Sequence, residues 1–194
     1  MVSESSSGVS SRQRRSSSVP AESDSIPPTT RLFYTRGIHA VGVDLIAEVA
    51  GTTKKTLYDR FGSKDALVAL YLSTRFERWK AHVEAWLDGH GRGAVQALDA
   101  LEAWLESNTF GCAFVNANAE IGPDHPAVGV IRAEKEWMRE LYERLAEEAG
   151  APAAVGAQLH LLHEGAIIGY AVAAQADALD NARAAARTML GAGG

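Results

Sequence analysis

Residues 41–67, VGVDLIAEVAGTTKKTLYDRFGSKDAL, decide the fold of this chain. Apolar side chains recur at helical spacing before Gly51 and indicate a short helix. Glycine can adopt the positive φ that ends one helix and turns the chain toward the next. Thr52 or Thr53 then provides a suitable N-cap for a second helix that runs to about Phe61. The stretch therefore predicts a helix-turn-helix.

The second helix of this motif carries side chains suited to DNA. Leu57 and Phe61 are four residues apart, so they share one face of the helix and pack into the core. The outward positions mix cations, hydroxyl groups and one carboxylate: Lys54, Lys55, Thr56, Tyr58, Asp59 and Arg60. Such a mixture can contact phosphates and base edges, which favours a DNA-binding protein over a merely solvated basic helix.

Three segments of the chain resemble the TetR family of transcriptional regulators. LFYTRGIHAVGVDLIAEVAGTTKKTLYDRFGSKDAL, residues 32–67, looks like the family's helix-turn-helix with its flanking helices. GCAFVNANAEIGPDHPA (111–127) and LHLLHEGAIIGYAVA (159–173) resemble parts of its ligand-binding half more loosely. The resemblance spans roughly residues 29–190 and implies a dimeric regulator that binds a near-palindromic operator and a small-molecule effector.

The resemblance, together with the direction of the second motif helix, which we call the recognition helix, predicts the residues that contact DNA. Thr53, Lys54, Lys55 and Thr56 lie near the N-terminus of the helix, the end that enters the major groove. Tyr58 and Lys64 resemble the family's phosphate contacts, and Arg60 is expected to reach a phosphate or a base.

The chain departs from the family pattern in two places before the motif. Pro27-Pro28 permits a first helix only from about Pro28 to Arg36, because proline suits the first turn of a helix and no later position. Either the helix is naturally short, or a frame shift or misplaced start lies upstream. Val41-Gly42 stands where family members often have Thr-Ser, so a capping hydroxyl is missing.

The charge of the chain is divided between its ends. The net charge is −5, yet residues 1–75 carry +3 and residues 76–194 carry −8. The basic end is therefore suited to nucleic acid. Cys112 is the only cysteine, which excludes an intrachain disulfide, and no apolar run approaches the roughly 20 residues of a membrane span. A cytoplasmic protein is expected.

Residues 1–26 form a serine-rich segment that we expect to be a disordered tail. Serine occupies 11 of the first 25 positions, and apolar periodicity is absent there, so little surface could be buried to offset the ordering entropy. Arg12, Arg14 and Arg15 could make transient phosphate contacts, or the tail has no defined role.

The remaining sequence predicts an all-α protein with two folded parts. We expect a DNA-binding domain at residues 27–63 and a helical ligand-binding and dimerisation domain at residues 64–194. The predicted helices of the second part include 64–88, 94–108, 113–121, 152–174 and 178–190. One more helix is predicted between 121 and 152; Asp124 caps it, Pro126 lies in its first turn, and it runs to residue 149.

The first and last of these helices suggest how the parts connect. The 64–88 helix has apolar residues on two faces, so it is expected to bridge the two domains. Gly165, Gly169 and Ala173 recur every four residues and allow another helix to approach closely. The last two helices are therefore expected to form a homodimer through a four-helix bundle, with intrachain packing as the alternative.

Aromatic and polar residues of the C-terminal part predict a pocket for a mostly apolar small molecule. The expected lining residues are Trp79, Trp86, Trp104, Phe110, Phe114, Asn116, His163 and Tyr170. An ordinary core with satisfied polar groups is the alternative. His160 and His163 could share a helix face, but no established metal motif includes them, so no metal site is expected. Cys112 is expected to be a small buried residue rather than a reactive thiol.

An enzyme is the less favoured class. The sequence contains no nucleophile and base at a recognisable spacing, no phosphate loop and no cofactor motif, so no catalytic residue and no cofactor are predicted. The function expected is a ligand-responsive transcriptional regulator, most simply a repressor that a small molecule releases. The main alternative is a small-molecule-binding helical protein whose short first helix no longer supports DNA binding.

Overall fold

The computed structural model describes residues 28–191, and these form nine helices. The helices are α1 (Pro28–Arg36), α2 (Val43–Val49), α3 (Lys54–Phe61), α4 (Lys64–His90), α5 (Ala94–Ser107), α6 (Ala113–Glu120), α7 (Val128–Glu148), α8 (Ala153–Ala171) and α9 (Ala178–Met189). Strands are absent from this part of the chain, so the all-α prediction is confirmed. The predicted serine-rich tail lies outside the described residues.

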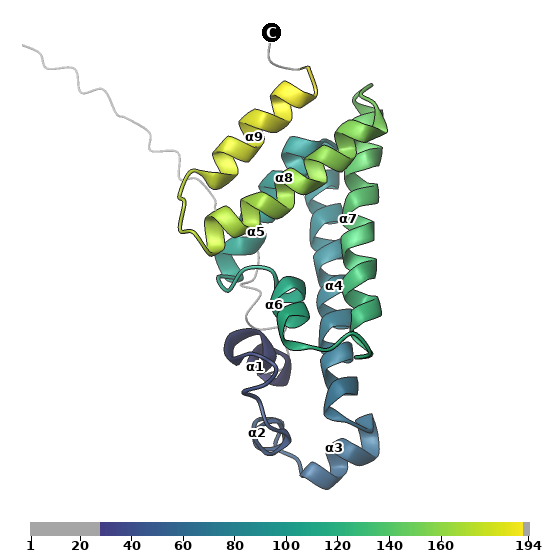
Figure 1. Ribbon diagram of the computed structural model, residues 1–194, viewed down its shortest axis with the longest axis vertical. Coiled ribbons are helices and arrows are strands. Elements are labelled where there is room, and N and C mark those ends of the chain that lie inside the picture. The colour runs from purple at the N-terminus through teal and green to yellow at the C-terminus, as the bar shows by residue number, and fades with distance from the viewer. Residues whose placement is uncertain (1–27, 192–194) are drawn as a thin grey trace, which may run out of the picture.

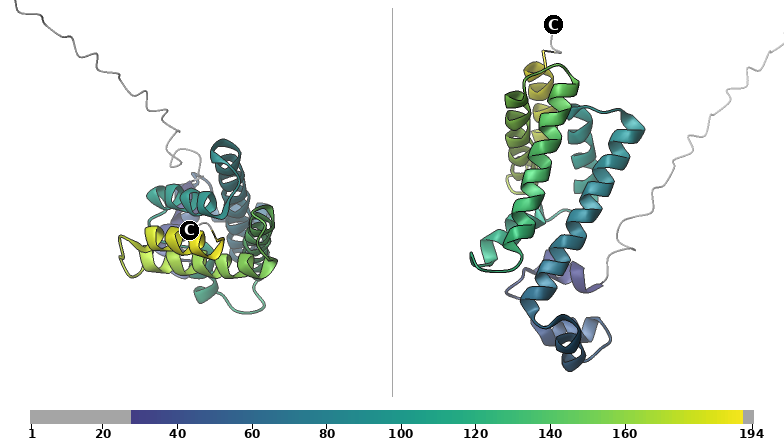
Figure 2. Two further views of the ribbon diagram at one scale, coloured as in Figure 1. Left: turned by 90° about the horizontal axis from the view of Figure 1, so that it is seen from above. Right: turned by 90° about the vertical axis from the view of Figure 1, so that its right-hand side faces the viewer.

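The molecule is elongated, with α1 to α3 at one end and α8 and α9 toward the other (Figure 1). Helices α4 and α7 run side by side along the long axis, and α4 extends from α3 to the far end of the molecule (Figure 2). Helix α6 lies between α1 and the upper helices. None of the helices within 28–191 combines the length and apolarity that crossing a bilayer requires.

Two hydrophobic cores stabilise this arrangement, and α4 contributes to both. Val68 and Leu72, both fully buried, pack in the smaller core with α1, α2, α3, α6 and the start of α7. Trp79 and Val83 pack in the larger core with α5, α7, α8 and α9. The bridging role predicted for this helix is therefore visible in its packing, and the smaller core extends past residue 63 into α4 and α6.

Helix α7 begins later than the sequence suggested. Asp124 does not cap it and Pro126 is not in its first turn, because the helix starts at Val128 and Ala127 is its N-cap. An N-cap at Asp124 would require helical backbone at His125, and a residue that precedes proline disfavours that conformation. Instead, the His125 amide donates to the Gly122 carbonyl at 3.2 Å, which forms a turn.

One close helix approach occurs at Gly156, outside the predicted stripe of small residues, and another at Gly169, inside it, where a Cβ would lie 3.1 Å from the Cβ of Ala178 at the start of α9. A Cβ at Gly156 would lie 2.6 Å from the backbone nitrogen of Glu143, so α8 packs against α7 with almost no space between them. In contrast, Gly165 has no atom within 4 Å of the position of a Cβ. Helix α8 also ends at Ala171 rather than near Ala174, whose φ of 53° is left-handed.

Candidate nucleic-acid interface and central cavity

Local capping fixes the position of the second motif helix, α3. Gly51 has a φ of 61° and turns the chain after α2. The Thr53 hydroxyl then accepts a hydrogen bond from the Thr56 amide at 3.1 Å and caps α3. Leu57 is buried and anchors the helix to the smaller core. Of the two threonines considered as caps, Thr53 is therefore the one used.

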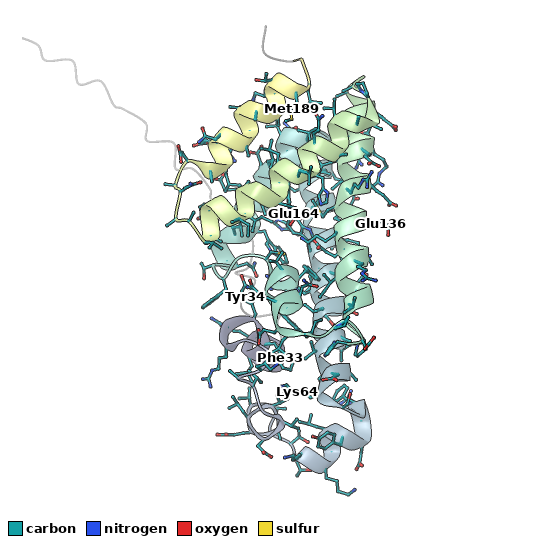
Figure 3. All side chains as sticks on the ribbon, viewed as in Figure 1. Phe33, Tyr34, Lys64, Glu136, Glu164 and Met189 are labelled. Carbon is teal, nitrogen blue, oxygen red and sulfur yellow. The ribbon has the colours of Figure 1, made fainter. Side chains whose placement is uncertain are left out.

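The side chains predicted to contact DNA gather at one end of the molecule. Most of them are exposed on α3 and its cap: Thr53, Lys54, Lys55, Thr56, Tyr58 and Arg60. Lys64 is half-buried at the start of α4, at the same end as α3 (Figure 3). The arrangement presents hydroxyl groups and cations together on an exposed surface, which is what phosphate and base contacts require.

The cations of α3 are held loosely. Lys54 pairs with Asp44 of α2 at 3.1 Å, and Lys55 pairs with Asp59 one turn along α3 at 2.9 Å. Exposed ion pairs of this kind contribute at most about 1 kcal/mol each. Both ammonium groups can therefore exchange their carboxylate for a phosphate without a large cost to the fold.

The first helix of the motif, α2, has no side-chain N-cap, as the sequence predicts. Gly42 is the N-cap of α2 and provides no side-chain hydrogen bond, while Val41 is fully buried in the smaller core. Helix α1 begins at Pro28 and ends at Arg36, the bounds predicted from the prolines.

Two contacts tie α1 and the segment after it to the body of the protein. The Tyr34 hydroxyl donates to the Gly111 carbonyl and accepts from the Phe110 amide, both at 3.0 Å. The Glu120 carboxylate, at the end of α6, accepts from the amides of Ile38 at 3.0 Å and His39 at 2.7 Å. Burial opposes the charged form of Glu120, but these backbone hydrogen bonds prevail and lower its pKa.

Four of the eight residues predicted to line a pocket share a small cavity inside the helical body. Trp79, Trp104, Phe114 and His163 line this central cavity, which has a volume of about 30 Å³. Arg75, Cys112 and Glu134 also line it, and the sequence alone had not placed them there. Arg75 could have been recognised, because it falls on the inward stripe of α4 between Leu72 and Trp79.

The other four predicted pocket residues lie elsewhere. Phe110 and Asn116 line a separate cavity of about 220 Å³ between α1 and α6. Trp86 stacks on His90 near the end of α4, with ring centroids 4.2 Å apart. Tyr170 is exposed on α8. The structure therefore does not gather the eight residues around one site.

A buried polar network borders the central cavity. Lys135 of α7 lies 2.8 Å from a carboxylate oxygen of Glu164 on α8 and 3.1 Å from one of Glu134. Burial disfavours the carboxylate of Glu164, but the His160 ring, whose Nε2 lies 3.5 Å from it, and the charge of Lys135 outweigh this effect and hold the pKa of Glu164 at about 2. Glu164 is labelled in Figure 3.

The remaining nucleophile and histidine of this region are held neutral. Burial raises the pKa of the Cys112 thiol and prevails over the nearby Lys135 ammonium, whose nitrogen is 3.5 Å from the sulfur. Burial also lowers the pKa of His163 to about 3, and its Nδ1 lies 3.0 Å from the Tyr142 hydroxyl. Among residues 28–191, no group of histidine, cysteine and carboxylate side chains is arranged to hold a metal ion.

Comparisons with known proteins agree with this geometry. Residues 29–71 match the family model described as bacterial regulatory proteins of the tetR family. Among curated proteins, none matches the chain significantly. The chain is similar in structure to SCO4454, a TetR-family transcriptional regulator from Streptomyces coelicolor, with 29% identity over 85% of this chain and 91% of that one, at a TM-score of 0.74.

Two further solved structures share the fold at lower identity. The reduced form of NemR from Escherichia coli is 19% identical, with a TM-score of 0.68 over 84% of this chain and 92% of that one. A TetR transcriptional regulator from Legionella pneumophila is 16% identical, with a TM-score of 0.67 over 82% and 91%. Residues 29–71 therefore carry the helix-turn-helix sequence of the TetR family of transcriptional regulators, and most of the remaining length has the fold of solved members of that family.

Proposed function

We propose that this protein is a ligand-responsive repressor, a two-fold dimer that leaves its operator when a small molecule enters the helical body. The observation that carries the proposal is the position of α4. This helix begins beside the exposed surface of α3 and forms one wall of the central cavity 11 residues later, at Arg75. A change at the cavity therefore reaches the DNA-binding end through one continuous helix.

Release of DNA requires a difference in affinity between two states. An effector that prefers a tilted α4 shifts the population toward a spacing of the two recognition helices that no longer fits successive major grooves. Because the central cavity holds only about 30 Å³ in this conformation, roughly the share of one water molecule, an effector must move the surrounding helices in order to bind.

The proposed dimer uses an exposed apolar stripe on α8 and on Val172, the residue that caps its C-terminus. Leu161 is 70% exposed and Val172 is 73% exposed, and Ile168 lies between them on the same face. Gly165, also on this face, leaves space for a close partner. A stripe with spacings of four, three and four residues is typical of a helix that packs against another helix.

We expect Leu161→Asp to convert the dimer to a monomer, because a carboxylate would be desolvated in the centre of the proposed interface. Analytical ultracentrifugation measures the change. Ala133→Asp, on the exposed surface of α7, is the matched control and should remain dimeric. A Leu161→Asp protein that stays dimeric at micromolar concentration would move the interface away from this stripe.

DNA binding is tested by fluorescence anisotropy with the intergenic DNA upstream of the gene, at two salt concentrations and with an unrelated duplex as control. We expect tight, salt-sensitive binding to the upstream DNA alone. Lys64→Ala should weaken binding by about tenfold across all sequences and reduce the salt slope by about one, as expected for a residue that binds a phosphate. Lys55→Ala should also weaken binding.

The control for these variants is Lys80→Ala, because Lys80 lies on α4 16 residues beyond Lys64 and pairs with Glu77. If Lys64→Ala binds DNA as the unchanged protein does, Lys64 does not contact the duplex. Equal, weak binding of the unchanged protein to both duplexes would favour the second candidate function, a small-molecule-binding protein without specific DNA affinity. The start of α1 at Pro28 is the observation that keeps this candidate in view.

A further inference from the structure

Arg75 is a buried cation without a carboxylate partner among residues 28–191. Its side chain extends from α4, and only 5% of the residue's surface is exposed. One guanidinium nitrogen donates to the Asn108 side-chain oxygen at 2.7 Å. The guanidinium also lies over the rings of Tyr34, at 4.1 Å, and Trp104, at 5.3 Å. All of these partners are neutral.

This environment is unusual for arginine. Charged side chains are almost never buried without an opposite charge, because their desolvation costs several kcal/mol. A guanidinium carries five N–H donors in a planar fork that matches a carboxylate. Aromatic faces and one amide recover part of the desolvation cost, but they do not replace an anion.

The charged groups around Arg75 leave this cation available. Lys135 already lies between Glu134 and Glu164, so its ammonium is used by two carboxylates. His163 faces the same cavity and is neutral above pH 3. Glu134 is buried, and its Oε2 has no hydrogen bond despite the nearby Lys135. The central cavity thus has one available cationic donor, Arg75, in a wall that is otherwise mostly apolar and aromatic.

We propose that Arg75 binds the carboxylate of the effector, and that the effector is a small apolar carboxylic acid. The guanidinium would form paired hydrogen bonds with the carboxylate, while Trp79, Trp104 and Phe114 enclose the apolar body. Burial raises the pKa of Glu134, which weakens the repulsion between this group and an incoming carboxylate.

The same arginine connects the cavity to the DNA-binding end. Tyr34, whose ring Arg75 covers, belongs to α1, and its hydroxyl bridges Gly111 and Phe110. A carboxylate that draws the guanidinium into the cavity removes it from this ring. The inference rests on the proposed function for its biological meaning, but acid binding itself is measurable without DNA.

The test is isothermal titration calorimetry of the full-length protein with phenylacetate, indole-3-acetate and octanoate, each compared with its amide. At least one acid should bind with one site per protomer and at least tenfold more tightly than its amide. Arg75→Gln should abolish that preference, whereas Arg75→Lys, which keeps the charge but not the fork, should retain part of it. Arg139→Gln, on the exposed face of α7, is the matched control and should behave as the unchanged protein.

Two results would overturn the proposal: no acid preferred to its amide, or a preference that survives in a folded Arg75→Gln protein. Circular dichroism establishes folding, and Arg75→Lys provides the comparison if the glutamine variant unfolds. The anisotropy experiment is then repeated with the tightest acid, which should raise the Kd for the operator. Acid binding without specific DNA binding would refute the proposed repressor but not the role of Arg75.

Discussion

Gly156→Ala is expected to lower the free energy of unfolding by about 3 kcal/mol, the upper part of the range for overpacking a well-packed contact. The added methyl group would overlap the backbone of α7 at Glu143 and Tyr142, and backbone cannot move aside as a flexible side chain can. The two helices would have to separate along their contact, where Leu141, Leu145 and Leu159 are fully buried. Urea denaturation followed by circular dichroism measures the loss of stability.

The matched control is Gly129→Ala on α7. No atom lies within 4 Å of the position of its Cβ, so alanine should leave stability unchanged or raise it by up to about 1 kcal/mol. A Gly156→Ala protein as stable as the control would mean that α7 and α8 lie farther apart than described.

Mild acid is expected to destabilise the protein by about 2 kcal/mol between pH 7 and pH 5, through His163. Its pKa is about 3 in the folded chain, against an ordinary value of 6.5. Within this window the unfolded chain binds a proton that the folded chain does not, so stability falls as the pH drops below 6.5 and continues to fall until about pH 3. Urea titrations at fixed protein concentration and several pH values measure the slope.

The His163→Gln variant separates this effect from other acid-sensitive groups. Glutamine can still hydrogen-bond the Tyr142 hydroxyl but does not titrate, so its stability should vary little between pH 7 and pH 5. Glu164 does not confound the comparison, because its depressed pKa affects stability only below its ordinary value of about 4.5. An equal slope in the variant would assign the acid sensitivity to another group.

Local chemistry explains why the helix-turn-helix could be predicted from the sequence. Gly51 and Thr53 act within a few residues of their own positions, and so does the pair of prolines that sets the start of α1. The predicted start of α7 is wrong because Pro126 disfavours helical backbone at His125, and this restriction outweighs the capping preference of Asp124.

The central cavity could be predicted only in part, because it depends on contacts between distant segments. Trp79 and Trp86 are both on α4, and no local sequence feature distinguishes them. Trp79 contacts Met138 in the core, whereas Trp86 stacks on His90. The stripe that Arg75 shares with Leu72 marks it as inward-facing, but its neutral surroundings come from α1 and α5. Packing of those helices is not encoded in any one of them.

The contacts of Tyr34 and Glu120 have a practical consequence for hybrid regulators. A chimera joined at residue 63 would combine one protein's α1 with another's α6, and both contacts cross that boundary. Gly37 adds a third requirement. Its φ is 83°, and a Cβ at this position would lie only 3.0 Å from Oε1 of Glu120. A chimera that changes DNA specificity and keeps its response to the effector therefore has to take the segment from Gly111 to Glu120 from the same protein as α1 to α3.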